Sequence, residues 1–132
     1  MAPFPIRPRT DADLPEVAAL LRATHESDAY PVVIPDDLEA WGAAHDLRGA
    51  LVAVDGPRVV GHVVLTDPDD GPATAQWVDA TGLEAHQLGV VRRLVAHRRA
   101  QGTGTGRELL ATAVGEAHRL GLRPVLDMSD NL

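Results

Sequence analysis

The sequence predicts a single α/β domain over residues 1–132, in which helices flank a mixed β-sheet in the order β-α-α-β-β-β-α-β. Three observations carry this prediction. Two apolar runs at residues 50–54 and 59–65 flank a tight turn, as in an antiparallel hairpin. A helical apolar stripe at residues 104–120 separates strand-like runs at 90–96 and 125–128, which indicates a parallel β-α-β unit with a right-handed crossover. The chain length suits one hydrophobic core and not comfortably two.

The N-terminal part is expected to contain one strand and two helices. Residues 4–9 form a short run punctuated by prolines, which suits an edge strand. A capping-box pattern and apolar residues at helical spacing predict a first helix over residues 10–24. Residues 25–35 are expected to form a loop, because prolines bracket a short β-branched run. The acidic residues 36–39 open a brief second helix.

The later elements follow from turn residues and periodicity. Residues 67–74, rich in Asp, Pro and Gly, are expected to form a solvated loop. Residues 77–88 have no clear pattern and fit either a short strand or a helix. The helix of residues 104–120 ends at Gly121, and Pro124 prevents its continuation. The first strands should therefore be antiparallel and the last pair parallel.

Composition excludes several kinds of protein. The net charge is −7, which argues against a general nucleic-acid binder. All 12 basic residues are arginine, so a Walker-type phosphate loop, a Schiff base and a lysine nucleophile are excluded. No cysteine is present, and no metal site is expected. We expect no membrane association, because no apolar run approaches the roughly 20 residues of a membrane span. With no secretory signal visible, a cytoplasmic location is expected by default.

A glycine-rich segment, Gln101-Gly102-Thr103-Gly104-Thr105-Gly106, stands between the fourth predicted strand and the last predicted helix. Glycine lets the backbone approach a ligand with no Cβ in the way. The free N–H groups of the first helical turn and the helix dipole favour an anion there. The segment therefore predicts a backbone-built phosphate or pyrophosphate site, with the threonine hydroxyls as further donors. A passive flexible connection is the alternative.

This segment resembles the Q/R-x-x-G-x-G/A signature of the GNAT superfamily of N-acetyltransferases. The runs Ile6-Arg7-Pro8, Val59-Val60-Gly61-His62-Val63 and Val125-Leu126-Asp127-Met128 are similar to strands of that family. The resemblance implies an N-acetyltransferase that moves an acetyl or short acyl group from acetyl-CoA to a primary amine of a small molecule or peptide. The amine would attack directly, with no metal. A non-catalytic module that binds acyl-CoA is the second hypothesis, and an unrelated mononucleotide binder is the third.

The resemblance also implies where the cosubstrate binds. Backbone N–H groups of the glycine-rich segment would hold the pyrophosphate, and the fourth strand would splay from the fifth at a β-bulge. That strand's backbone would pair with the pantetheine arm and polarise the thioester carbonyl. The implied cofactor-binding residues are Leu94, Val95, Ala96, Gln101, Gly102, Thr103, Gly104, Thr105, Gly106, Arg107 and Asn131. Arg98 and Arg99 would attract the 3′-phosphate or simply be solvated.

Candidate side chains for the chemistry are fewer. Glu84 and His86 are candidates for the catalytic base, with solvated loop residues as the alternative. Asp28, Tyr30 and Trp41 are candidates for the acceptor pocket, because relatives build that pocket between the early helices. The alternative is that the two aromatic residues pack this region onto the sheet. His62 either reaches the cleft or lies on an open face of the sheet.

Relatives continue beyond the fifth strand with a helix that carries a tyrosine and with two further strands, which these 132 residues lack. A shortened chain, a region supplied by another subunit and a protein that binds without turnover all explain this difference. The fifth strand would then be an exposed edge. We therefore expect a homo-oligomer or a second chain that covers it.

Overall fold

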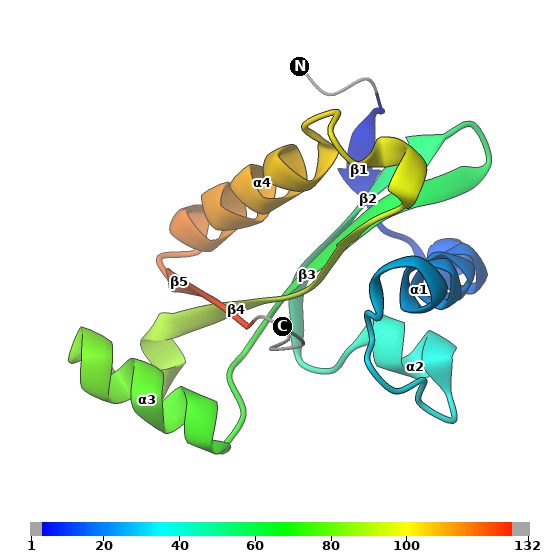
Figure 1. Ribbon diagram of the computed structural model, residues 1–132. Coiled ribbons are helices and arrows are strands. Elements are labelled where there is room, and N and C mark those ends of the chain that lie inside the picture. Colours follow the sequence, from blue (N-terminus) through cyan, green and yellow to red (C-terminus); the bar gives the residue numbers. More distant parts are fainter. Residues whose placement is uncertain (1–3, 128–132) are drawn as a thin grey trace.

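A five-stranded sheet in the order β1-β2-β3-β4-β5 forms the centre of the molecule (Figure 1). The computed structural model describes residues 4–127. Strands β1 to β4 pair in antiparallel fashion, and β4 and β5 are parallel, which confirms the predicted mixed sheet. The strands are β1 (Ile6–Pro8), β2 (Leu47–Asp55), β3 (Arg58–Thr66), β4 (Leu88–Ala96) and β5 (Arg123–Leu126).

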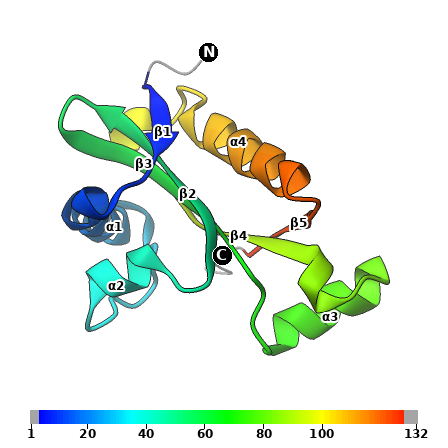
Figure 2. The ribbon, with the colours of Figure 1, turned by 180° about the vertical axis from the view of Figure 1, so that it is seen from behind.

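Helices cover both faces of this sheet. The helices α1 and α2 lie on one face and α4 lies on the other, as the two opposite views show (Figure 1, Figure 2). Helix α3 lies beyond the end of the sheet where β4 begins. Their bounds are α1 (Leu14–Asp28), α2 (Leu38–Ala43), α3 (Pro72–Thr81) and α4 (Thr105–Arg119). Three short 3-10 turns, η1 (Asp11–Asp13), η2 (Ala85–Gln87) and η3 (Arg98–Ala100), precede α1, β4 and α4.

Two apolar layers hold the helices to the sheet. Between α4 and the sheet, the α4 residues Leu109, Ala113 and Ala117 pack with β3 and β4. These three residues belong to the stripe predicted from the helical spacing. Between α1 and the sheet, a second layer contains Val17, Leu20, Leu21, Leu38, Val52, Val59 and Val95. Strand β3 is buried from Val59 to Thr66 because it lies between both layers.

Gly61 of β3 sets how closely α4 approaches the sheet. A Cβ at this position would lie 2.8 Å from Cδ1 of Leu109, 3.2 Å from Cβ of Ala53 and 3.3 Å from Cγ2 of Thr105. The missing side chain therefore lets the first turns of α4 rest directly on β3. Since α4 begins at Thr105, this contact also positions the glycine-rich segment that precedes the helix.

The structure differs from the prediction in two helical segments. Helix α1 continues to Asp28 instead of ending near Thr24, and it stops at Ala29, which adopts the left-handed conformation (φ 56°). Residues 72–81 form α3, so the predicted loop of residues 67–74 was wrong from Pro72 onward. Proline in the first turn and a left-handed Gly82 after the last residue are ordinary helix boundaries. The helix buries only Thr74, which left no apolar stripe in the sequence to reveal it.

Within residues 4–127, β5 is an outer strand of the sheet. The expected covering of this edge by another chain stays a prediction. None of the helices in the described part of the chain combines the length and the apolar character needed to cross a membrane.

Replacing Gly61 with alanine should lower the free energy of unfolding by about 1–3 kcal/mol, the usual cost of overpacking a core. The added methyl group would meet Leu109 and Ala53. Urea unfolding followed by circular dichroism measures this change. Gly115→Ala is the matched control, because a Cβ at this exposed α4 position meets no atom within 4 Å. The control should be neutral or gain up to about 1 kcal/mol from helix propensity, and an equally stable Gly61→Ala variant would contradict the argument.

Candidate functional site

Among the described residues, strand β4 pairs with β5 only along its first half, and we call the side of β4 that has no described partner beyond Val91 the splay. The two strands pair from Leu88 to Val91, opposite Arg123 to Leu126. The backbone N–H of Asp127 still donates to the carbonyl of Val91 (2.9 Å). Among the described residues, the rest of β4 pairs only with β3. Within residues 4–127, this half of β4 therefore has one edge without a strand partner, and the divergence of the two strands that the resemblance implied stays a prediction.

A β-bulge lies where this open edge begins. His62 of β3 is opposite Val95 and Val64 is opposite Arg92, so two residues of β4 face the single Val63. One of these two, Arg93, has a left-handed backbone (φ 55°), which a non-glycine residue rarely adopts. The bulge places the backbone of Arg93 and Leu94 beside the splay. Leu94, Val95 and Ala96, the residues expected to meet the pantetheine arm, follow along the open part of β4.

The glycine-rich segment forms a tight turn at the N-terminus of α4. Gly102 (φ 79°) and Gly104 (φ 87°) adopt left-handed conformations, and Gly104 is the N-cap of α4. A Cβ at Gly102, Gly104 or Gly106 would meet no protein atom within 4 Å. The outer side of the turn is thus open backbone at the positive end of a 15-residue helix. Arg107, in the first turn of that helix, is exposed.

The threonine hydroxyls of this segment form hydrogen bonds within the turn. Thr105 is fully buried, and its Oγ1 lies 2.7 Å from Oγ1 of Thr103. The Thr103 hydroxyl also donates to the carbonyl of Ala100. The expectation that the Thr105 hydroxyl donates to a ligand was wrong, because this side chain points into the core. The backbone N–H of Thr103 donates to the carbonyl of Ala100 (3.3 Å), whereas the backbone N–H of Thr105 stays a candidate for a phosphate contact.

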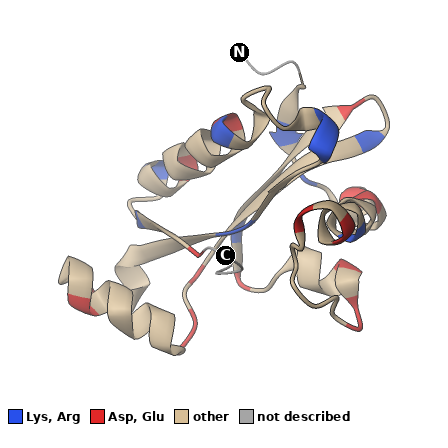
Figure 3. Ribbon diagram, viewed as in Figure 1, with Lys and Arg blue, Asp and Glu red and all other residues tan. Residues whose placement is uncertain are grey.

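Gln101 connects the turn to the end of α1. Its Nε2 donates to Oδ2 of Asp28 (2.9 Å) and to the carbonyl of Ala96 (3.3 Å). Asp28, a predicted acceptor residue, therefore lies against the glycine-rich turn. The basic residues of η3 lie at the same end of the sheet (Figure 3). Arg98 is exposed, and Arg99 pairs with Asp55 at the β2–β3 turn.

Glu84 and His86 lie at the other end of β4. They pair with each other (Oε2 to Nδ1, 3.2 Å), and both side chains are more than three-quarters exposed on η2. Six residues along an extended strand span about 20 Å, so the structure keeps this pair away from the bulge. Neither residue lines the cavity described next. Their role as the catalytic base stays a prediction that this geometry does not favour.

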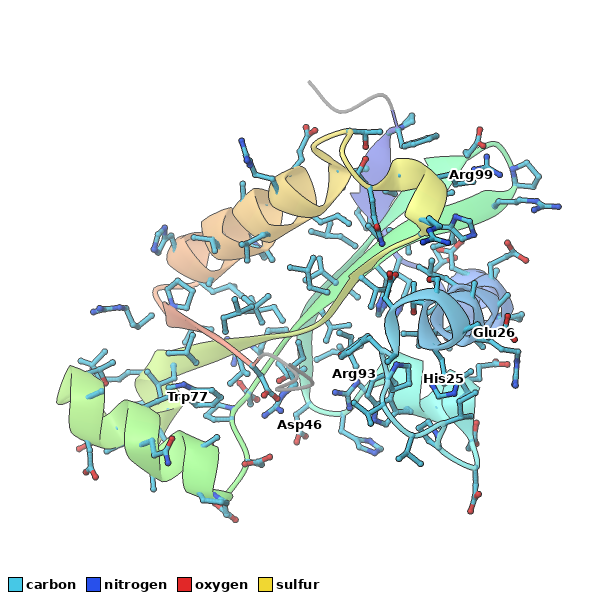
Figure 4. The ribbon with its side chains drawn as sticks, viewed as in Figure 1. His25, Glu26, Asp46, Trp77, Arg93 and Arg99 are labelled. Carbon is cyan, nitrogen blue, oxygen red and sulfur yellow. The ribbon has the colours of Figure 1, made fainter. Side chains whose placement is uncertain are left out.

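A cavity of about 320 Å³ opens beside the bulge on the α2 face of the sheet. The guanidinium of Arg93 reaches from β4 toward α2 and lies 3.7 Å from the centre of the Trp41 ring (Figure 4). Its Nε donates to the carbonyl of Trp41 (3.1 Å). The cavity is lined by Ala40, Trp41, Ala44, His45, Asp46, Thr66, Asp67, Asp69, Arg92 and Arg93.

Tyr30 packs against Trp41, with ring centres 5.9 Å apart, and burial raises the pKa of its hydroxyl. Of the predicted acceptor residues, the structure thus brings Tyr30 and Trp41 together on the α2 side of β4. Trp41 contributes directly to the lining of the cavity. Asp28, by contrast, joins the glycine-rich turn.

Arg92 was not among the predicted site residues, and its side chain connects β4 to three neighbouring segments. Its Nε donates to Oγ1 of Thr66 (3.2 Å), one nitrogen lies 3.5 Å from Asp69, and another pairs with Asp127. These partners come from β3, from the β3–α3 loop and from the residue after β5. A pair of arginines inside an apolar strand was the available signal, because a charged residue there needs partners.

His62 neither lines the cavity beside the bulge nor lies on an open sheet face, so both predictions for it were wrong. It is fully buried, with Nε2 3.0 Å from the guanidinium of Arg9 and Nδ1 3.2 Å from the carbonyl oxygen of Arg93. Burial, with Arg9 close by, lowers its pKa to about 3. The ring is therefore neutral in the folded protein at physiological pH.

Two further expectations concern Asn131 and the binding of a metal ion. Asn131, expected near the pantetheine arm, lies outside the described residues. Within residues 4–127, no three His, Asp or Glu side chains are grouped closely enough to hold a metal ion.

Comparison with known proteins agrees with this geometry. The model of the acetyltransferase (GNAT) family matches residues 14–132. No curated protein matches the sequence at a significant level. Among solved structures, a GNAT family acetyltransferase from Brucella melitensis in complex with acetyl-CoA is 22% identical (TM-score 0.68), with 98% of this chain and 80% of that chain covered.

Two further structures have the same fold. A GNAT family N-acetyltransferase from Escherichia coli in complex with CoA is 24% identical (TM-score 0.64), with 96% of this chain and 63% of that chain covered. An acetyltransferase of the GNAT family from Staphylococcus aureus is 12% identical (TM-score 0.70), with 96% of this chain and 75% of that chain covered. These likenesses concern the fold.

Stability should fall when the pH drops below about 6.5, because an unfolded histidine takes up a proton near that pH. Folded His62 stays neutral down to about pH 3, so the unfolded state binds more protons between these values. Between pH 7 and pH 5 the expected contribution is a loss of about 2 kcal/mol. Urea unfolding at both pH values measures it. A His62→Gln variant lacks this titration, and an equal pH dependence in both proteins would contradict the assignment.

Proposed function

The chain belongs to the acetyltransferase (GNAT) family, and we propose that it transfers an acetyl group from acetyl-CoA to a primary amine. The observation that carries this proposal is the open glycine turn at the N-terminus of α4, beside the splay of β4 and β5. An anion-binding turn and a strand with one free edge are the two features that a long, phosphate-bearing thioester requires.

The residues present fit the pyrophosphate of CoA. A Cβ at any of the three glycines would project into open space. Its absence lets a ligand approach the backbone of the turn closely. The N–H groups of the first turn of α4 have no acceptor within the helix, so they suit an anion bound at this turn. Arg98 and Arg107 are exposed nearby and add positive charge. The similar Brucella melitensis and Escherichia coli structures contain acetyl-CoA and CoA, which supports this assignment.

Acetyl transfer needs positioning and charge stabilisation more than a protein nucleophile. The neutral amine attacks the thioester carbonyl, a C–N bond forms, the C–S bond breaks, and CoA leaves as its thiolate. The amine loses one proton, which passes to water or to a base. A backbone N–H at the bulge of β4 would stabilise the oxyanion. The acceptor would enter through the cavity lined by Trp41 and Arg93, where the carboxylates of Asp46 and Asp69 attract an ammonium group.

Gly106→Glu should weaken the binding of CoA by at least about tenfold, a change of about 1.4 kcal/mol. The new side chain would fit the fold, because it faces open space, and it would put a negative charge where the pyrophosphate binds. Isothermal titration calorimetry with CoA measures the dissociation constant. Gly115→Glu makes the same substitution further along α4, also into open space, and should bind CoA like the wild type. Equal affinity of both variants for CoA would refute the proposed pyrophosphate site at the glycine-rich turn.

Activity separates the enzyme from a non-catalytic binding module. We expect the wild-type protein to release free thiol from acetyl-CoA when a primary amine is added, and not when the amine is omitted. A thiol-reactive dye and a panel of amines measure this. Binding of acetyl-CoA without thiol release across the panel would support the module instead. Binding of ATP in preference to CoA would refute both and favour a mononucleotide binder.

A further inference from the structure

The buried His62 has a single possible tautomer. A guanidinium group can only donate hydrogen bonds, so Nε2 of His62, 3.0 Å from Arg9, accepts one. The ring is neutral, and its one proton is therefore on Nδ1. That proton is directed at the carbonyl oxygen of Arg93, 3.2 Å away. Both ring nitrogens are thus committed, and the ring donates to the bulge of β4.

Arg9 fixes the Nε2 side of the His62 ring. Its guanidinium also donates to the carbonyls of Gly42 (3.2 Å) and Ala43 (3.0 Å) at the end of α2. These bonds place its remaining donor at His62. The order of contacts is therefore the end of α2, Arg9, His62 and the carbonyl of Arg93.

The carbonyl of Arg93 belongs to the peptide that the bulge distorts. The left-handed backbone of Arg93 costs on the order of 1 kcal/mol for a residue with a Cβ. Such a conformation persists when its surroundings hold it in place. The hydrogen bond from His62 holds the carbonyl, and the side-chain bond to Trp41 holds the other end of the same residue.

The direction of this peptide decides where a neighbouring donor points. In a planar trans peptide, the carbonyl and the next N–H point in opposite directions. The Arg93 carbonyl points to the ring of His62, so the N–H of Leu94 points away from that ring. On the side of β4 opposite β3, no described residue pairs with the strand beyond Val91.

We propose that His62 is a positioning residue for acetyl transfer, which holds the Arg93–Leu94 peptide so that the Leu94 N–H faces the thioester carbonyl in the splay. This inference rests on the proposed function, and it adds a role for a side chain that lies away from the substrate. The oxyanion contact would be made by the backbone, and its direction would be set by the His62 ring and Arg9.

Two amide substitutions separate this role from simple packing. In His62→Asn, the amide nitrogen is attached at the same atom as Nδ1 and can still donate to the Arg93 carbonyl. In His62→Gln, the amide lies one bond further out, near Arg9, and that donor is lost. Both variants replace the ring with a polar group. His118→Gln, at an exposed position of α4, serves as the control.

We expect kcat of His62→Gln to fall at least about tenfold, because a misdirected oxyanion donor weakens an interaction made mainly in the transition state. KM for acetyl-CoA and the affinity for CoA should change by less than about twofold, since the glycine turn holds the pyrophosphate. His62→Asn should recover at least about fivefold of the lost rate. His118→Gln should match the wild type. Melting curves in the absence of ligand establish that each variant is folded.

The amide of Leu94 gives a readout that does not require turnover. In the wild type and His62→Asn, its ¹⁵N–¹H signal should shift more with acetyl-CoA than with CoA, because only acetyl-CoA has the thioester carbonyl. In His62→Gln the two ligands should give the same shift. Wild-type kcat in His62→Gln, an equal loss of rate in both amide variants, or equal Leu94 shifts in the wild type would each overturn the role of His62. A wild type that binds neither ligand would instead refute the proposed function.

Discussion

The backbone conformation of Arg93 is the constraint on which the site depends. Strand β4 stays paired with β3 on both sides of the bulge, whereas among the described residues it pairs with β5 only up to Val91. The extra residue on β4 bends the strand locally at this point without ending its ladder with β3. The cavity, the packing of α2 and the burial of His62 all adjoin this residue.

Arginines connect the parts of the site that the sheet alone would leave separate. Arg9 and Arg93 donate to three successive carbonyls at the end of α2, those of Trp41, Gly42 and Ala43. Cations are favourable at this end of a helix, where carbonyls lack partners. Arg92 joins β3, the β3–α3 loop and the residue after β5 in the same way. These arginines therefore fix the positions of α2 and of the β3–α3 loop relative to β4.

The sequence revealed the elements whose signals are local. The Asp55–Arg58 hairpin, the apolar stripe of α4 and the glycine-rich turn each follow from residues next to one another, and the structure contains all three. The family resemblance, which the family model confirms, also implied the bulge in β4. Helix α3 escaped prediction because it buries almost nothing, so its boundary residues had no apolar pattern to accompany them.

The partners of the site residues could not be read from the chain in the same way. Gln101 meets Asp28, and His62 meets Arg9 and Arg93, across 73, 53 and 31 residues respectively. These contacts depend on how α1, β1 and β4 are placed by the whole sheet. Whether Thr105 faces a ligand or the core depends on the packing of α4 against Gly61, which no local pattern reports.

The use of arginine at the cavity has a consequence for chemical selectivity. In the proposed reaction, a lysine in place of Arg92 or Arg93 would bring an ε-amine into the cavity, and that amine would compete with the acceptor for the acyl group. A guanidinium group stays protonated near neutral pH and is not a nucleophile there. In the proposed reaction, the arginine cations of this cavity are thus inert toward the acyl group, and neither of them competes with the acceptor amine.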